Sequence, residues 1–425
     1  MSPTFRALRV RNYRLFFAGA LVSNTGTWMQ RVAQDWLVLQ LSGSGTAVGI
    51  TTALQFLPML LFGLWGGVLA DRLPKRRILM ASQAFLGLQA LALGVLVLSG
   101  AAQVWHVYLL AFFMGIGTAV DNPARQSFVV EMVGRDDLSN AVALNSSSFN
   151  GARLLGPAVA GFLIAAIGTG PVFLINAASY LAVILGLRLM RPDELSPAPR
   201  APGGKGQLRA GLRYVTGRPD LLLPVIIVFF VGTFGMNFQL TLVLFADQVF
   251  HQGADAFGLL SSALAAGTLS GALLAARRSR PQLRIVVIAA VVFGALEMIT
   301  GLMPTYWTFA AMLVPTGMAL LTMITTANAT MQLGASPAMR GRVMALYMMV
   351  FFGGTPIGAP IIGWLAEQVG PRSSLLVGGA VSVIATVVAT ALLARRQGLV
   401  IRAHFRPRPH FHVLEPGVPD QAQSA

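Results

Sequence analysis

The amino-acid sequence predicts an all-α membrane protein in which twelve transmembrane helices form two bundles of six. Three observations predict this fold class. The 425-residue chain is 55% hydrophobic and only 11% charged, whereas a soluble domain is about a quarter charged. Its apolar residues gather into twelve long runs. Its basic residues fall almost entirely in alternate gaps between those runs, which is typical of a multi-pass membrane protein.

Each apolar run has the length of a membrane-spanning helix, about 20 residues for a hydrocarbon core of ~30 Å. The runs are continuous and do not alternate with period two, which favours helices over strands. The first run follows a basic segment but has no small-residue cleavage site after it, so we interpret it as a span rather than a signal peptide. The runs cover residues 15–39, 47–70, 78–99, 104–121, 142–166, 171–190, 221–245, 256–276, 285–303, 306–333, 343–366 and 373–394.

The positive charges predict the topology. With an even number of spans, 28 of the 31 Lys and Arg residues lie on the side of the termini, while the opposite side carries Arg372, and Arg31 and Arg153 lie inside spans. The positive-inside rule then places both termini in the cytoplasm. The net charge of +16 therefore reflects topology and contact with anionic lipid headgroups, and we expect no nucleic-acid partner. The preference for Arg over Lys indicates a bacterial chain, so the expected location is the bacterial plasma membrane.

A polar interval at 191–220 divides the spans six and six. We expect a cytoplasmic segment (1–13), an N-terminal bundle (14–190), a cytoplasmic linker (191–220) with a short helix at its end, a C-terminal bundle (221–396) and a disordered basic tail (397–425). A shift of 202 residues lays 142–168 over 344–370 with 8 of 27 positions identical. Two repeated six-helix halves are a transporter arrangement with a substrate site between the halves.

The residues that most enzymes and metal sites need do not form a recognisable set. The chain has no cysteine, which excludes disulfides and thiolate metal sites. His106 and His251 are isolated, and the "HFH" at His410–His412 in the tail is too short to count as a metal site. No phosphate-binding loop or nucleophile–base pattern is present. We therefore expect neither an enzyme nor a cofactor or metal. A membrane-embedded enzyme or sensor is the third alternative, behind two kinds of transporter.

Two motifs resemble those of a known family. "GGVLADRLPKRRIL" (66–79) resembles the loop 2–3 signature of the major facilitator superfamily, and "GARLLGPAVAG" (151–161) resembles the span 5 motif of its drug/proton antiporters. The segment around "DNPARQSF" (121–128) is similar to the branch that contains the enterobactin exporter and macrolide efflux proteins. One position departs from the pattern, because Ala111 stands where span 4 often has an arginine, so no proton relay is assigned to it.

The resemblance implies a latch that closes the cytoplasmic side. Asp71 would accept hydrogen bonds at the start of span 11, near 340–343, and Lys75 or Arg76 would pair with Asp121 at the cytoplasmic end of span 4. The alternative is that the basic residues act only on topology. The predicted latch residues are Gly67, Asp71, Arg72, Lys75, Arg76 and Asp121.

The span 5 motif predicts close helix packing, with a gating role as the alternative. Its residues are Gly151, Gly156, Pro157 and Gly161, and we expect Ala263, Gly267 and Gly271 of span 8 to form the opposing surface.

Four ionisable residues lie inside spans: Arg31, Asp35, Arg153 and Glu297. Such residues are costly in a bilayer and commonly mark a transport pathway. Arg31 and Asp35 are spaced i,i+4 and can meet on one helix face. The hypothesis is that protons entering from outside neutralise Asp35 or Glu297, with Arg31 and Arg153 as partners. The alternative is a permanent Arg31–Asp35 ion pair with no transport role.

We therefore expect a monomeric alternating-access exporter of a small amphipathic molecule, such as a drug, a siderophore or a secondary metabolite, driven by proton antiport. Its partners would be that substrate, protons and the lipid bilayer. A lysolipid or lipid translocator, or an uptake carrier of the same fold, is the alternative. Aromatic and amide side chains suit an amphipathic cavity, and the expected lining residues are Asn24, Trp28, Gln34, Phe234, Asn237, Gln239 and Asn328.

Overall fold

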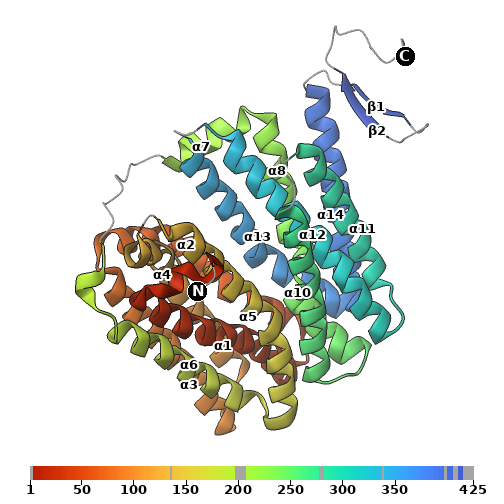
Figure 1. The fold of residues 1–425 in the computed structure, drawn as a ribbon. Coiled ribbons are helices and arrows are strands. Elements are labelled where there is room, and N and C mark those ends of the chain that lie inside the picture. The colour runs from red at the N-terminus through yellow and green to blue at the C-terminus, as the bar shows by residue number, and fades with distance from the viewer. Residues whose placement is uncertain are drawn as a thin grey trace.

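Two groups of long helices, inclined to one another, make up the molecule (Figure 1). The structure is a computed structural model, and it describes residues 3–134, 136–196, 207–276, 282–336, 339–396, 400–404 and 410–414. The first group is the N half, which ends at residue 196. The second is the C half, which begins at residue 207.

The N half consists of six long helices preceded by a 3-10 turn, η1 (Pro3–Arg9), and followed by a second such turn, η2 (Pro192–Glu194). Glycines allow the helices to pack closely. A Cβ atom on Gly19 would lie 2.9 Å from the Cα atom of Val183, which shows that the first and sixth helices lie in backbone contact. The helices are α1 (Arg11–Ser42), α2 (Gly45–Arg72), α3 (Lys75–Leu98), α4 (Val104–Val133), α5 (Leu138–Ile167) and α6 (Thr169–Arg188).

The C half begins with a short helix, α7 (Gln207–Thr216), which packs against the start of α13 through Gly211. The seventh span is interrupted and consists of α8 (Pro219–Phe230), the π-helical turn η3 (Val231–Gly235), α9 (Phe238–Leu244) and the π-helical turn η4 (Phe245–Val249). The remaining helices are α10 (Ala254–Ala276), α11 (Leu283–Gly301), α12 (Tyr306–Gly334), α13 (Arg340–Val369) and α14 (Arg372–Arg396).

The twelve-helix fold is confirmed. In the part of the chain that the structure describes, eleven helices are long and apolar enough to cross a membrane. The twelfth is α1, whose charged and amide residues lower its hydropathy. With 32 residues, α1 is about 48 Å long at 1.5 Å per residue, and it packs along α5 and α6. Each helix lies within a few residues of its predicted run except α4.

Three features differ from the expectations. Helix α4 does not end near Asp121 but continues through Pro123 to Val133, because its later turns still have an apolar side to pack on the N half. The seventh span was expected to be one regular helix and instead contains two π-helical turns. In the tail, which was expected to be disordered, β1 (Val400–His404) and β2 (His410–Leu414) form an antiparallel pair. Alternating sequences such as "VIRAH" favour strands.

The helix ends define two faces of the molecule. The basic face contains the α2–α3 turn at 73–74 and the residues that follow α6. The opposite face contains the turns at 43–44, 250–253 and 370–371. The halves are in contact near the opposite face. There Ser44 Oγ donates a hydrogen bond to Glu367 Oε2 (2.6 Å) and the Thr46 backbone N–H donates to the same oxygen (3.0 Å).

Rings and glycines complete this contact. Trp36 of α1 stacks on Phe257 of α10, with ring centroids 6.4 Å apart and an interplanar angle of 18°. Gly161 of α5 faces the α10 backbone, where an added Cβ would lie 3.0 Å from the Cα atom of Gly258. We call Trp36, Ser44, Thr46, Phe257 and Glu367 the opposite-face seal. These residues join the two halves at that face.

The halves diverge toward the basic face (Figure 1). Gly67 near the end of α2 is a predicted latch residue, and Gly341 at the start of α13 lies in the segment 340–343 that Asp71 was expected to meet. A Cβ added to either would meet no atom within 4 Å. The side chain of Asp71 lies outside the described residues, so its part of the latch stays a prediction. The backbone at these two glycines is not packed against the other half.

Candidate functional site

One face of α1 carries Asn24, Trp28, Arg31 and Asp35. Their spacing of four, three and four residues places them in one stripe along the helix. Asn24 Nδ2 lies 3.5 Å from Ser148 Oγ of α5, at hydrogen-bond distance. The stripe therefore lies along the side of α1 next to α5. Sequence reasoning singled out these residues separately, and their spacing was the signal that connects them.

The other polar residues of α1 point into the N half. Gln30 donates a hydrogen bond to Gln89 Oε1 (2.9 Å) and accepts one from Asn176 Nδ2 (2.5 Å). Gln34, expected in the cavity, is fully buried and accepts a hydrogen bond from Gln55 Nε2 (3.1 Å). The turn of the helix therefore directs Gln34 toward α2, and its place in the cavity stays a prediction.

Two arginines and three aromatic rings form a cluster around Trp28. The Arg31 guanidinium carbon lies 5.1 Å from the centroid of the Trp28 ring and 5.0 Å from that of Phe56 on α2. The Arg153 guanidinium carbon lies 5.8 Å from the Trp28 centroid, and Phe149 contacts Trp28 edge-on at 5.8 Å. These are cation–π and aromatic contacts. We call the five residues the arginine–aromatic layer.

The position of Arg153 on α5 shows where this layer lies. Gly156 faces α1, since an added Cβ would be 2.7 Å from the Trp28 Cβ atom, and the Pro157 carbonyl faces Gly258 of α10. Arg153 is one turn from both, on the side of α5 between its contacts with α1 and α10. It forms no hydrogen bond or ion pair with any described residue. The arginine–aromatic layer therefore lies where the N half faces the C half.

Asp35 lies next to Trp36 of the opposite-face seal. Its side chain is 1% exposed, and neither carboxyl oxygen has a hydrogen-bond partner among the described residues. The Nε atom of Arg31 is likewise buried without a partner. Arg31 and Asp35 do not form an ion pair within 4 Å in this structure, so the permanent ion pair considered above is absent here.

Glu297 of α11 is separate from the other three ionisable residues. It is 1% exposed, and its Oε2 atom has no hydrogen-bond partner among the described residues. A Cβ on Gly235 would lie 3.0 Å from that oxygen, and one on Gly378 would lie 2.8 Å from Oε1. The carboxyl group is therefore enclosed between the π-helical turn η3 and α14, inside the C half.

The remaining predicted cavity residues lie in the C half. Asn237 is buried in the break between η3 and α9, and it donates a hydrogen bond to the Thr233 carbonyl oxygen (2.7 Å). Phe234 and Gln239 are half-buried on either side of it. Asn328 of α12 is half-buried and accepts a hydrogen bond from Gln332 (2.7 Å). The unwound turn at Asn237 is a feature that sequence reasoning missed.

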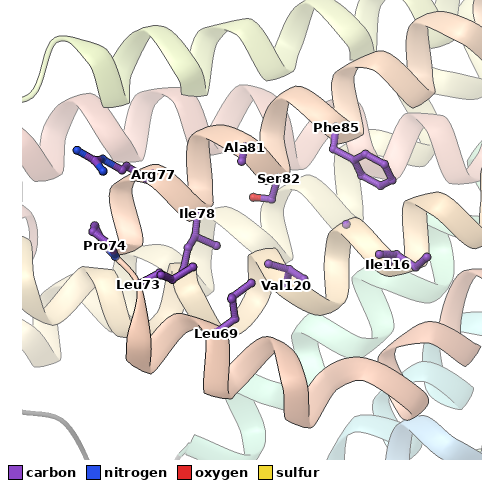
Figure 2. Close-up of a pocket in the computed structure, with 11 residues that line it drawn as sticks. Leu69, Leu73, Pro74, Arg77, Ile78, Ala81, Ser82, Phe85, Ile116 and Val120 are labelled. Carbon is purple, nitrogen blue, oxygen red and sulfur yellow. The ribbon is translucent and has the colours of Figure 1, made fainter.

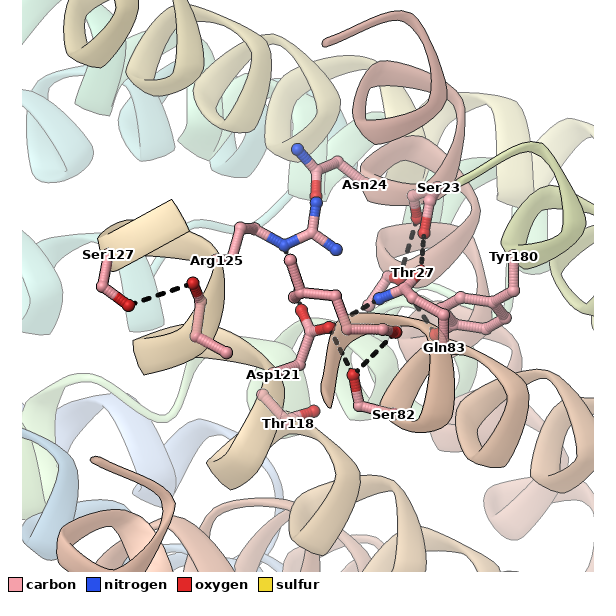
Figure 3. Close-up of polar contacts among 12 residues, drawn as sticks. Ser23, Asn24, Thr27, Ser82, Gln83, Thr118, Asp121, Arg125, Ser127 and Tyr180 are labelled. Carbon is pink, nitrogen blue, oxygen red and sulfur yellow. Dashed lines mark hydrogen bonds and ion pairs between the residues drawn. The ribbon is translucent and has the colours of Figure 1, made fainter. Parts of the chain in front are cut away.

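Asp121 lies in a polar network within the N half, not in the expected latch (Figure 3). Ser82 Oγ and Gln83 Nε2 of α3 each donate to Asp121 Oδ1 at 2.8 Å. Arg125 Nε, one turn further along α4, donates to Asp121 Oδ2 at 2.9 Å. Gln83 in turn lies 3.5 Å from Ser23 of α1. The network joins α4, α3 and α1.

The expected pairing of Lys75 or Arg76 with Asp121 is therefore wrong. Lys75 Nζ instead donates to Glu131 Oε1 at 2.6 Å, and both side chains are largely buried. Arg76 donates to the carbonyl oxygens of Leu187 and Arg188 at the end of α6. The reason is the length of α4, which places Glu131 and not Asp121 beside the start of α3. Arg72 is exposed.

We expect Lys75→Met or Glu131→Gln to destabilise the protein by about 1–3 kcal/mol, because each leaves the partner's charge largely buried without a counter-charge. Thermal unfolding of the purified protein in detergent measures this. The double variant Lys75→Met/Glu131→Gln should lose less than the sum of the single losses. Additive losses would contradict a direct interaction between the two charges.

The packing motif of α5 has a different partner from the one expected. Gly161 and Pro157 meet Gly258, and Ser262 Oγ donates to the Leu154 carbonyl oxygen (2.9 Å). Gly267 and Gly271 pack instead against α12, and Ala263 does not face the motif's glycines. The expected surface is therefore wrong for Gly267 and Gly271, and Gly258 and Ser262 of α10 contact α5 instead. Gly151 faces open space.

A pocket of about 470 Å³ lies in a groove between α2, α3 and α4, and all the residues that line it belong to the N half. Figure 2 shows Pro74 and Arg77 at one end and Phe85 and Ile116 at the other. The pocket is mainly apolar and does not contain any residue of the arginine–aromatic layer. It is therefore separate from the surface between the halves.

The chain matches the family model described as transmembrane secretion effector over residues 2–413. It is 27% identical to the multidrug efflux pump Tap of Mycolicibacterium fortuitum over 394 residues, 90% of this chain and 96% of that protein. It is 25% identical to the staphyloferrin A transporter of Staphylococcus aureus over 266 residues, 61% and 66% of the two chains. It is 23% identical to macrolide efflux protein A of Streptococcus pyogenes over 393 residues, 89% and 96%.

Solved transporters share the fold. A bacterial homologue of the human lysosomal transporter Spinster, in an inward-facing and unoccupied conformation, superposes with a TM-score of 0.67 at 18% identity, covering 90% of this chain and 96% of that one. A POT family transporter in complex with a thioalcohol-conjugated peptide gives 0.73 at 13% identity, covering 91% and 96%. The protein is a membrane transporter and not an enzyme. The chain belongs to the transmembrane secretion effector family of the major facilitator superfamily.

Proposed function

We propose that this protein exports a small amphipathic molecule across the bacterial plasma membrane by alternating access, in exchange for protons. Its relatives are named for multidrug efflux, macrolide efflux and siderophore transport, which supports a drug, a siderophore or a secondary metabolite as the substrate. The basic face is the cytoplasmic face, in keeping with the positive-inside rule. Both termini are then cytoplasmic, and a single chain contains both halves of the site.

The observation that carries the proposal is the unpaired carboxyl group of Asp35, buried next to the opposite-face seal. A bare carboxylate is costly to bury without hydrogen bonds. A proton therefore neutralises Asp35 while the seal is closed. When the seal opens, Asp35 meets water on the outside, from which the inward proton gradient reloads it.

Alternating access requires two arrangements of the halves. In the arrangement described here, the seal holds the opposite face together, and the glycines at the latch positions are not packed against the other half. In the other arrangement, the seal separates and the latch around Gly67, Asp71 and Arg72 closes the cytoplasmic face. Such a change is a rocking motion of two rigid bundles.

The substrate is proposed to bind at the arginine–aromatic layer and at the surface of the C half around the break in the seventh span. The lining residues are Asn24, Trp28, Phe234, Asn237, Gln239 and Asn328. Glu297 is the second candidate for proton coupling. Its carboxyl group lies against η3, so a change in its protonation would alter the packing of the turn that precedes Asn237.

The test is a comparison of cells with and without the protein. We expect the protein to lower the accumulation of at least one amphipathic drug, siderophore or metabolite, and a proton uncoupler to remove that effect. In everted membrane vesicles, adding that compound should release protons from the vesicle interior. If everted vesicles still accumulate the compound after complete loss of the proton gradient, proton antiport is rejected. Movement of labelled lipid alone would favour a lipid translocator.

A further inference from the structure

We propose that the Arg31 side chain makes proton binding and substrate binding mutually exclusive, and that the space it fills between Trp28 and Phe56 accepts a planar aromatic group of the substrate. This inference rests on the proposed function, because it assigns a coupling residue and a substrate class to that same site.

In this structure, the Arg31 side chain covers two aromatic rings. Its guanidinium group is close to the rings of both Trp28 and Phe56, with centroid distances of 5.1 and 5.0 Å. A guanidinium group is flat and stacks on aromatic faces much as a ring does. While Arg31 stays there, neither ring offers that face to another ligand.

The Arg31 side chain has a second position available, beside Asp35. Asp35 is four residues further along the same helix face, which allows an i,i+4 ion pair. That pair is absent from the described residues, and the Asp35 oxygens and the Arg31 Nε atom are all buried without hydrogen-bond partners. Ionisation of Asp35 would create a counter-charge for Arg31 in a medium where charges interact strongly. The guanidinium would then leave the two rings.

The other groups around Arg31 do not provide this switch. Besides Asp35, the charged or titratable groups that interact with Arg31 are Tyr180 on α6 and Arg153 on α5. Arg153 carries the same charge in both states and repels Arg31 from the layer. Tyr180 is engaged with Thr27, at 3.1 Å between their hydroxyl oxygens. Asp35 is therefore the group whose charge decides the position of Arg31.

This movement of Arg31 makes substrate binding depend on loss of the proton from Asp35, as antiport requires. A protonated Asp35 leaves Arg31 on the rings and blocks the aromatic space. An ionised Asp35 draws Arg31 away and opens that space to a substrate. A proton and a substrate therefore cannot occupy the site together. The vacated space is bounded by Trp28 and Phe56, so it suits a flat aromatic ring and excludes a bulky, non-planar group.

The test is equilibrium binding of two probes to the purified full-length protein. Ethidium is planar and tetraphenylphosphonium is not, and both keep one positive charge at every pH used, so any pH dependence belongs to the protein. For the wild type we expect ethidium to bind about tenfold more tightly at mildly alkaline than at mildly acidic pH, the size of a desolvated cation–π contact. Tetraphenylphosphonium should bind weakly at both.

Two variants should change the ethidium result in opposite directions. Asp35→Asn cannot ionise, so binding should be weak at both pH values. Arg31→Ala always leaves the space open, so binding should be tight at both, and Arg31→Met is a second variant of the same kind should the alanine variant fail to fold. A merely structural role for Arg31 would weaken binding in every variant. Arg188→Ala, at an exposed arginine of the basic face, is the control and should behave as the wild type.

Three outcomes would overturn the inference: ethidium binding that does not depend on pH in the wild type, weak ethidium binding in both Arg31 variants, and equal affinity for the two probes. The proposed function can fail separately. If the binding pattern appears but vesicles show no proton exchange, antiport is refuted and the Arg31 switch stands. If vesicles exchange protons for substrate but binding does not depend on pH, the switch alone is refuted.

Discussion

Replacement of Asp35 by Asn is expected to abolish proton-driven export. The amide has nearly the same shape as the carboxyl group, so the packing of Trp36 on Phe257 next to it should persist. An amide does not take up a proton at neutral pH, and the seal would then open and close without carrying one. Substrate-driven proton release in everted vesicles should fall about tenfold or more, as expected when the carboxyl group that carries the proton is removed.

The matched variant is Glu297→Gln, which removes the other buried acid without touching the N half. If Asp35 alone carries the proton, Glu297→Gln should keep most of the proton release. If proton release were lost in Glu297→Gln but kept in Asp35→Asn, the proton would be carried by Glu297 in the C half and not by Asp35. Full substrate-driven proton release in both variants would reject the proton hypothesis. Correct folding of each variant is checked by size-exclusion chromatography and thermal unfolding.

The second large effect is expected from Gly161→Val. A Cβ atom at this position would overlap the Ala254 carbonyl oxygen and lie 3.0 and 3.1 Å from the Cα atoms of Gly258 and Asp255. These are backbone atoms of α10 and have no flexible side chain that gives way. The valine should therefore force α5 and α10 apart and favour the arrangement with an open opposite-face seal. Export should be lost because the halves no longer alternate.

The opening of the opposite-face seal can be measured by cross-linking introduced cysteines, because the chain has no cysteine of its own. Cysteines placed at Ser44 and Glu367, whose side chains form a 2.6 Å hydrogen bond across the seal, should be joined efficiently by a short bifunctional thiol reagent. Gly161→Val should reduce the yield about tenfold, equivalent to a shift of about 1.4 kcal/mol in the closed state. The control is Gly151→Val on the same helix, where an added Cβ meets nothing within 4 Å. An unchanged yield in Gly161→Val would show that this contact does not hold the seal.

The helices and their topology were predictable from the sequence because local composition determines them. In a bilayer each backbone polar group must bond within its own segment, so a continuous apolar run of sufficient length is a helix wherever it lies. Even α1, with Arg31 and Asp35 in its middle, was identified from its length. The exceptions are local. The end of α4 and the two π-helical turns of the seventh span depend on packing that composition does not reveal.

The sequence identified which residues belong to the candidate site but not which of them contact one another. Buried charges are rare enough in spans for Arg31, Asp35, Arg153 and Glu297 to be visible in the sequence. Which of them meet could not be predicted, because Arg153 reaches Trp28 only through the packing of α5 against α1. Likewise, Glu297 proved to be enclosed within the C half, away from the other three.

The membrane class, the twelve spans, the two halves and the family motifs could all be read from the amino-acid sequence alone, since each follows from periodicity, length or charge along a single segment. The partners of the side chains became visible only in the folded protein: Lys75 with Glu131, Asp121 with Ser82, Gln83 and Arg125, Gly161 with Gly258, and Arg31 with two aromatic rings in place of Asp35. The physical reason is that contacts between helices depend on rotation about each axis and on depth along it. Both are set by the packing of the whole bundle, so a single segment does not contain that information.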